Sequence, residues 1–213
     1  MTKRALFVLL LLEIIGTSFA GNDDRQTILW SRNRPLVWSD FQGKLDAKIV
    51  AQNPVEGDQV IEDGNRTTII HTEMDAYCYQ QIEFMSKYYG DTVTYEVKTL
   101  FNVAKSWTNS TSDYILNHEQ RHFDLGEVYA RKLRKYLRDS LTGYESSVQN
   151  KIFTRYINEN QEAQKRYDSL TNHSINSEAQ LNYNLQIDSL LNAYEDCAAI
   201  QVKKYAPRKV KKK

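Results

Sequence analysis

The chain has 213 residues, with 28 basic and 27 acidic side chains, so its formal charge at neutral pH is only +1. Hydrophobic residues make up 41% of the composition, which suits a single domain with a substantial core. Outside a short basic tail at the C-terminus, nothing in this composition favours a nucleic-acid-binding protein.

The first twenty residues have the pattern of a secretory signal peptide. Lys3 and Arg4 form a charged start, an apolar stretch covers residues 5–19, and a small-x-small cleavage site ends at Ala20. The apolar stretch is shorter than the roughly 20 residues that a membrane-spanning helix needs, and no later segment qualifies. We therefore expect an exported protein, periplasmic or secreted, with an uncleaved signal anchor as the alternative.

The part of the chain before residue 104 is expected to be rich in strands. Residues 26–43 favour a strand followed by a turn, and residues 44–66 are polar and loop-like. Residues 67–79 form an apolar run typical of a strand, and residues 80–90 are compatible with either a short helix or a strand. Residues 92–103 alternate between apolar and polar side chains and predict a strand.

The sequence HEQRH at residues 118–122 is the most informative feature of the chain. On a helix, His118 and His122 lie on one face, one turn apart, where both imidazoles can bind one metal ion. Glu119 lies beside them and can act as general base on a metal-bound water. This is the H-E-x-x-H pattern of zinc peptidases. The alternative is a pair of buried histidines satisfied by hydrogen bonds alone.

The sequence around this motif predicts a long amphipathic helix over residues 112–142. Ser110 and Asp113 have the form of a capping box at its start. Arg131 and Arg134 are expected on its solvent-exposed face. The opposite stripe, which should face the interior, carries both motif histidines together with Ile115, Leu125, Tyr129, Leu133 and Tyr136.

A catalytic zinc ion usually has three protein ligands and one open position, so the two motif histidines need a partner. Asp124 is two residues past the second histidine and should point to the opposite side of the helix. Two further histidines remain: His71 lies in a predicted strand, and His173 lies in a polar break between helical segments. A break that returns the chain to the active-site helix favours His173, with His71 as the alternative.

Two more helices are expected after the motif, over residues 145–169 and residues 177–204, with Leu181 and Leu185 on the inner side of the second of them. Strands that precede helices indicate the α+β class, with a small antiparallel or mixed sheet packed on the long motif helix. An edge strand of such a sheet could pair with an extended peptide. No internal linker is evident, so residues 21–202 are expected to form one domain.

Cys78 and Cys197 are the only cysteines. In an oxidising compartment a disulfide between them is plausible, and it would connect the strand region to the last helix. The alternative is two buried free thiols.

Residues 203–213 carry seven basic side chains and no acidic ones. Such a tail is typically disordered and solvated. The alternative is that it contacts the anionic surface of a cell envelope.

Four segments of the chain together resemble a bacterial family of predicted secreted zinc-dependent proteases, long classed as a domain of unknown function. They are LVWSDFQG at 36–43, SW at 106–107, LNHEQRHFDLGEVYARKLR at 116–134 and YDSLTNHS at 167–174. The resemblance implies a zincin-like metallopeptidase with one Zn²⁺ per chain. It also implies that His118, His122 and His173 bind the metal and that Glu119 is catalytic.

This chain departs from the family pattern at three positions. Arg121 occupies a position that usually has a smaller residue, Ser174 replaces a common glycine, and Tyr183 replaces an expected tryptophan. The departure at Arg121 lies inside the motif, where its side chain could shade the site or orient an acidic group.

Hydrolysis of a peptide bond also needs a donor for the oxyanion and groups that orient the metal ligands. The candidates for the oxyanion donor are Tyr167, Tyr183, His71 and Arg121, and those for orienting a histidine are Asp124 and Asp168. The functional alternative is a secreted or envelope-associated binding module with a structural or vestigial metal site.

Overall fold

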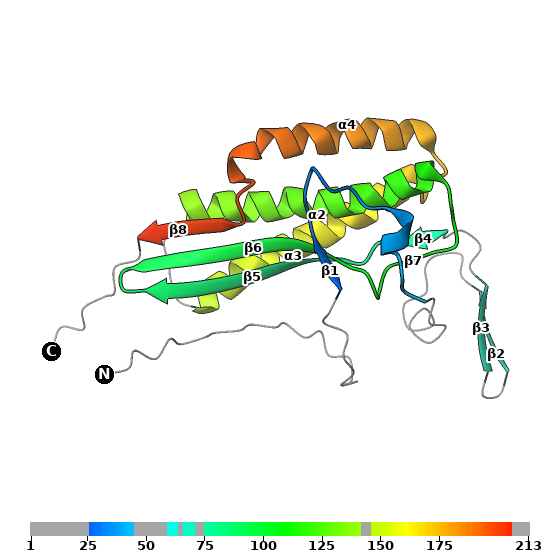
Figure 1. Cartoon of the computed structure of the whole chain (residues 1–213), viewed down its shortest axis with the longest axis horizontal. Coiled ribbons are helices and arrows are strands. Elements are labelled where there is room, and N and C mark those ends of the chain that lie inside the picture. Colours follow the sequence, from blue (N-terminus) through cyan, green and yellow to red (C-terminus); the bar gives the residue numbers. More distant parts are fainter. Residues whose placement is uncertain (1–25, 45–58, 64–65, 71–74, 142–145, 206–213) are drawn as a thin grey trace.

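The computed structural model describes residues 26–44, 59–63, 66–70, 75–141 and 146–205 (Figure 1). The predicted signal peptide, His71 and the tail beyond residue 205 lie outside the described residues.

The largest sheet has four antiparallel strands with β6 in the centre (Figure 1). β5 pairs with one edge of β6, whereas β1 and β8 share the other edge. Side chains of β6 alternate, so that Val93, Tyr95 and Val97 are fully buried while Thr94 and Glu96 are partly exposed. The strand predicted at 92–103 is confirmed, and residues 80–90 are a strand. The strands of this sheet are β1 (Thr27–Leu29), β5 (Gln80–Tyr89), β6 (Thr92–Asn102) and β8 (Gln201–Tyr205).

Two smaller antiparallel pairs complete the described strands: β2 with β3, and β4 with β7. The predicted strand at 67–79 therefore corresponds to two separate elements, β3 and β4. Their bounds are β2 (Gln59–Asp63), β3 (Arg66–Ile70), β4 (Ala76–Tyr77) and β7 (Trp107–Thr108).

The strand and turn expected over residues 26–43 are correct only at β1. The WSD sequence forms a short 3-10 helix, η1 (Trp38–Asp40). The Asp40 carboxylate holds this turn, because it accepts a hydrogen bond from the Val37 backbone N–H and two from the Arg34 guanidinium.

The three helices follow every described strand except β8, and the α+β class is confirmed. α2 lies between the large sheet and α4 (Figure 1). It also contacts α3, which packs directly against β5 through Phe153 and Phe84. Leu133 and Leu137 of α2 pack on β6, while Leu125 and Val128 contact the core that α3 and α4 share. The helices are α2 (Asp113–Asp139), α3 (Ser146–Thr171) and α4 (Ser177–Ala193).

Other elements cover α2 on two sides, so the prediction that Arg131 and Arg134 face solvent is wrong. Arg131 and Arg134 are only 2% and 1% exposed. Both guanidinium groups form ion pairs with the buried carboxylate of Glu127, one and two turns earlier in the same helix. Burial of the two arginines is possible because this carboxylate and several backbone carbonyls accept their hydrogen bonds.

The helix expected over residues 177–204 ends at Ala193. A short 3-10 helix, η2 (Glu195–Cys197), follows, and β8 then pairs with β6. The first three residues of the predicted basic tail therefore belong to a strand. Leu181 and Leu185 are each 61% exposed, contrary to expectation, because the inner face of α4 is formed by Gln180, Ile187 and Leu191.

The expected disulfide is also wrong, since Cys78 and Cys197 are both free and buried. The Cys78 backbone N–H donates a hydrogen bond to Glu119, whereas the Cys197 carbonyl accepts one from Arg134. These partners are 15 residues apart on α2, or about 22 Å along its axis. A disulfide requires Cα atoms within about 7 Å of each other, so the cysteines are too far apart.

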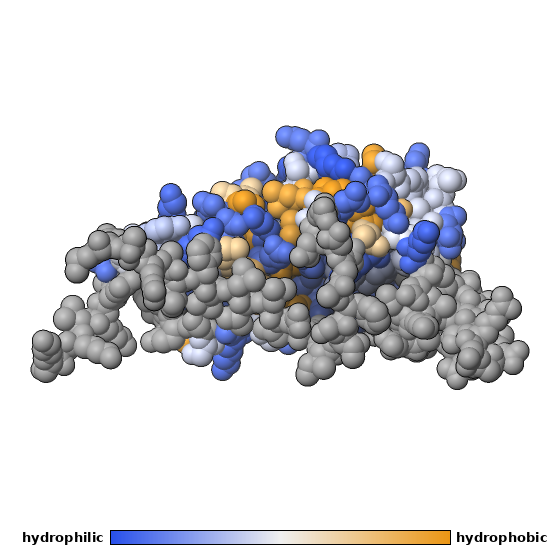
Figure 2. All heavy atoms as spheres, turned by 60° about the horizontal axis from the view of Figure 1, so that its bottom comes forward, coloured by the Kyte–Doolittle hydropathy of each residue, from blue (hydrophilic) through white to orange (hydrophobic). Residues whose placement is uncertain are grey.

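The described surface is mixed in character. In Figure 2, hydrophobic residues form a band in the middle of the visible face, and hydrophilic residues surround it. None of the described helices is long and apolar enough to cross a lipid bilayer.

Candidate metal centre

The two motif histidines lie on the inner face of α2, as their spacing predicts. Their ring centroids are 4.8 Å apart and their Nε2 atoms are 3.2 Å apart. His118 is 4% exposed, and the side chain of His122 is 12% exposed. Two imidazole nitrogens thus point toward one place inside the protein.

Asp168, on the last turns of α3, supplies a third ligand atom at this place. Its Oδ1 lies 3.2 Å from His118 Nε2 and 2.9 Å from His122 Nε2. The ligands of a tetrahedral zinc ion with ordinary bond lengths are about 3.4 Å from one another. The three atoms therefore fit one zinc ion after shifts of a few tenths of an ångström. Among the described residues, His118, His122 and Asp168 form the one group with the geometry of a metal site.

The charges of the group favour a cation. Burial lowers the pKa of His122, but the Asp168 carboxylate outweighs burial and raises this pKa to about 9. Burial raises the pKa of Asp168, but the two histidines outweigh it and hold the pKa far below its usual range. Burial is the main reason why the pKa of His118 is lowered. Without a metal ion, a proton on His122 pairs with the Asp168 carboxylate; a divalent cation would replace that proton.

Tyr167, one of the candidates for the oxyanion donor, forms a wall of this centre. Its fully buried ring stacks on His118 at 4.7 Å and meets His122 edge-on at 5.0 Å. Its hydroxyl lies 3.4 Å from the Asn184 side-chain oxygen, away from the imidazole nitrogens. Tyr183 packs against Tyr167 with ring centroids 5.3 Å apart, so it supports this wall from behind.

Glu119 is placed as a proton acceptor. The residue is 4% exposed, and burial is the largest influence that raises the pKa of its carboxyl to about 7. The Asp168 carboxylate acts in the same direction, while His122 and the Cys78 backbone N–H act in the opposite one. A carboxyl with this pKa can both accept and return a proton near neutral pH.

His173 lies next to the centre, behind Asp168. Its Nδ1 is 3.8 Å from Asp168 Oδ1, and His173 does not join the group of three ligand atoms. The residue belongs to a turn in which Asn172, His173 and Ser174 have φ angles of 48°, 48° and 74°. Left-handed backbone is unfavourable for histidine and serine, and such strain often accompanies a functional site.

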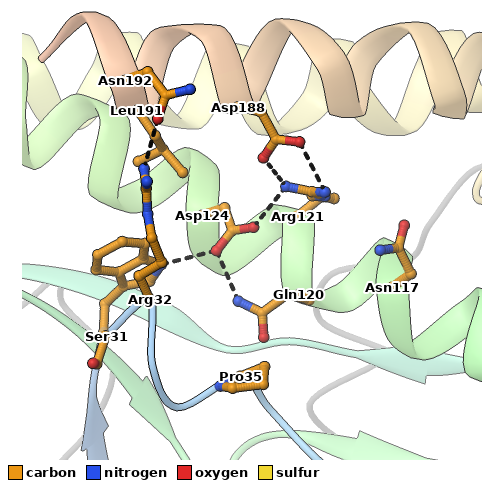
Figure 3. Close-up of a pocket in the computed structure, with 11 residues that line it drawn as sticks. Ser31, Arg32, Pro35, Asn117, Gln120, Arg121, Asp124, Asp188, Leu191 and Asn192 are labelled. Carbon is orange, nitrogen blue, oxygen red and sulfur yellow. Dashed lines mark hydrogen bonds and ion pairs between the residues drawn. The ribbon is translucent and has the colours of Figure 1, made fainter. Parts of the chain in front are cut away.

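Asp124 and Arg121 form their hydrogen bonds and ion pairs with groups other than the two histidines. They line a pocket of about 430 Å³ between α2, α4 and the segment that follows β1 (Figure 3). The Asp124 carboxylate accepts hydrogen bonds from Trp30 Nε1, Gln120 Nε2 and Arg121. Arg121 also pairs with Asp188 on α4 (Figure 3). The expectation that Asp124 orients a histidine is therefore wrong.

Three residues near the centre were missed in the sequence. Gln164 and Gln180 contact the Nδ1 atoms of the two histidines. Gln164 lies four residues before Asp168 on α3, and this spacing could have placed both on one helix face. Tyr77 is 41% exposed, and burial together with negative neighbours that include Glu119 and Asp168 raises its pKa to about 12.

Comparison with known proteins gives a family of uncharacterised role. The model of a family described as "Bacterial protein of unknown function (DUF922)" matches residues 89–174. The matched stretch contains His118, Glu119, His122, Asp168 and His173, and it covers less than half of the chain. No curated protein and no solved structure matches the chain.

Proposed function

We propose that this protein is an exported zinc-dependent hydrolase that cleaves peptide bonds. The observation that carries the proposal is the convergence of His118 Nε2, His122 Nε2 and Asp168 Oδ1 within 3.2 Å of one another, with Glu119 beside them. In this assignment Asp168 replaces His173 as the third ligand.

The donor set of two imidazoles and one carboxylate matches that of catalytic zinc sites. A bound zinc ion would polarise a substrate carbonyl and lower the pKa of a coordinated water. Glu119 takes a proton from the attacking water and later gives it to the leaving amine. The Cys78 backbone N–H holds the Glu119 carboxylate in place. Tyr77 is a candidate donor of a hydrogen bond to the substrate, since its pKa is raised in part by Glu119 and Asp168.

A second candidate function rests on the position of His173. The side chains of His173 and Asp168 are each 28% exposed and only 3.8 Å apart at their nearest polar atoms. In this candidate function His173 is a fourth protein ligand of the metal. A centre with four protein ligands is closed to substrate and is structural. The protein would then be an exported binding module.

Zinc content separates the possible ligand sets. The mature chain, wild type beside Asp168→Asn and His173→Asn, would be analysed for metal and titrated with zinc. Asparagine is a matched replacement for His173 because it tolerates left-handed backbone, so the turn is preserved. We expect one zinc per chain in the wild type and in His173→Asn, and strongly reduced zinc in Asp168→Asn. The reverse pattern would make His173 the third ligand.

Catalysis is tested with Glu119→Gln, which removes the base and keeps the shape of the side chain. We expect this variant to bind zinc as the wild type does and to lose hydrolysis of an unfolded protein substrate. Hydrolysis at the wild-type rate would refute the role of Glu119. The structural alternative would be established by two results together: the zinc-loaded wild type cleaves no peptide, and the His173→Asn variant binds no zinc.

A further inference from the structure

The amide of Gln164 can take only one orientation. Its Nε2 donates hydrogen bonds to the His122 backbone carbonyl and to Asn160 Oδ1, both at 3.0 Å. A flipped amide would place Oε1 against these two oxygens, which cannot donate. Gln164 Oε1 therefore faces His122 Nδ1, at 2.6 Å.

Gln180 on α4 repeats this arrangement at the other histidine. Its Nε2 points to the Tyr114 backbone carbonyl at 3.4 Å, and its Oε1 lies 3.2 Å from His118 Nδ1. The residue is 1% exposed, so water cannot replace either partner. A buried amide without partners is strongly unfavourable, which fixes this orientation as well.

The two amide oxygens determine where the imidazole protons lie. An amide oxygen can only accept a hydrogen bond, so both Nδ1 atoms must carry hydrogen. In a neutral imidazole the other nitrogen then has a free lone pair. The lone pairs of His118 Nε2 and His122 Nε2 are directed toward each other and toward the Asp168 carboxylate, at separations of 2.9 to 3.2 Å.

We propose that Gln164 and Gln180 are positioning residues that fix both histidines as Nδ1–H tautomers and thereby set the zinc affinity of the centre. The inference rests on the metal centre of the proposed function and goes beyond it, because neither glutamine is a ligand. Partners of this kind change metal affinity by roughly 10- to 100-fold when they are removed.

The test uses the mature chain with Gln164→Met and Gln180→Met, which remove the acceptor and keep an unbranched side chain of similar length. Zinc dissociation constants are measured by competition with a chelator. We expect each variant to bind zinc roughly 10- to 100-fold more weakly than the wild type. Gln81→Met is the matched control and should not change the zinc affinity, because the Gln81 side chain on β5 donates its hydrogen bond to Glu83 and not to a histidine.

Nuclear magnetic resonance of the imidazole groups gives a readout that a merely structural role would not move. The zinc-loaded wild type should show two slowly exchanging Nδ1–H protons, and each methionine variant should lose one of them. Wild-type affinity in both methionine variants, or Nε2–H signals in the zinc-loaded wild type, would overturn the proposal. If the wild type binds no zinc, the metal centre itself is refuted. This outcome differs from the one that refutes the role of the glutamines, in which the wild type does bind zinc.

Discussion

Glu127 is the centre of a buried ion cluster, and its replacement by glutamine is the sharpest test of how α2 is held. The carboxylate is 3% exposed. It accepts hydrogen bonds from Arg131 Nε at 3.0 Å, from Arg134 Nη1 at 2.7 Å and from Thr99 Oγ1 at 2.8 Å. Glu127→Gln keeps the shape of this side chain and removes its charge.

Glu127→Gln should lose much of the free energy of unfolding, because it leaves unpaired guanidinium charge inside the protein. Arg131 keeps an ion pair with Glu195, whose side chain is 59% exposed. Arg134 forms no other ion pair within the described part of the chain, and backbone carbonyls alone would face its charge. Breaking a buried pair from one side costs about 3–5 kcal/mol. That is a large share of a total stability of roughly 5–15 kcal/mol.

The measurement is equilibrium unfolding in urea, followed by circular dichroism. With a slope of roughly 2 kcal/mol per molar urea, the midpoint should fall by about 2 M. Glu162→Gln is the matched control because it breaks an ion pair with Lys165 in which both side chains are more than two-thirds exposed. Its midpoint should not change. The double variant Glu127→Gln with Arg134→Met should recover part of the loss, since it removes one unpaired charge. A loss below about 1 kcal/mol in Glu127→Gln would refute this account.

Three further predictions concern the strained turn, the thiols and the buried base. Ser174→Gly should raise the free energy of unfolding by about 1 kcal/mol in thermal or urea unfolding, because the residue has a φ of 74° that glycine adopts without strain; an unchanged stability would mean that the turn holds no strain. Cys78 and Cys197 should both react with a thiol reagent after unfolding and neither should react in the native state, since both are buried and free; an unfolded chain with no free thiols would establish the disulfide. In the metal-free protein, burial raises the pKa of Glu119 from 4.5 to about 7, so the folded state binds the proton more tightly than the unfolded state and stability falls as the pH rises between these values. Urea unfolding at pH 5 and pH 8 should therefore show the wild type losing up to about 3 kcal/mol relative to Glu119→Gln, and a parallel response of the two proteins would contradict the assignment.

Local patterns in the sequence predicted the parts of the fold that depend on local interactions. The alternation over residues 92–103 gave β6, and the apolar stripe through the motif gave α2. Residues 201–204 were included in the helix predicted over 177–204, because their strand conformation is set by β6, more than 100 residues earlier in the chain. Arg131 was placed in solvent because periodicity does not reveal that a helix is covered on two sides.

In the candidate centre, too, the residues set by local sequence could be predicted and those set by long-range packing could not. His118, Glu119 and His122 could be found in the sequence because one helix presents all three. The place of Asp168 depends on how α3 crosses α2, which no local pattern specifies. The sequence directed attention to the segment 167–174, but it favoured the histidine of that segment over its aspartate. Metal-binding motifs direct attention to histidine, whereas the residue of this segment that groups with His118 and His122 is Asp168.

α2 is suited to hold a metal centre because one half of the helix is anchored in the core and the other half carries the motif histidines. From Phe123 to Arg134 almost every side chain is buried, and the Glu127 cluster connects this half to β6, α4 and η2. Glu127 is nine residues after His118 and five after His122 on the same helix, or about 13 Å and about 8 Å along its axis. The helix backbone under the histidines is thus anchored from one end, while Gln164, Gln180 and Tyr167 fix their rings from α3 and α4. Ligands supported in this way on a rigid helix are arranged before any metal arrives, so little of the binding free energy is needed to order them.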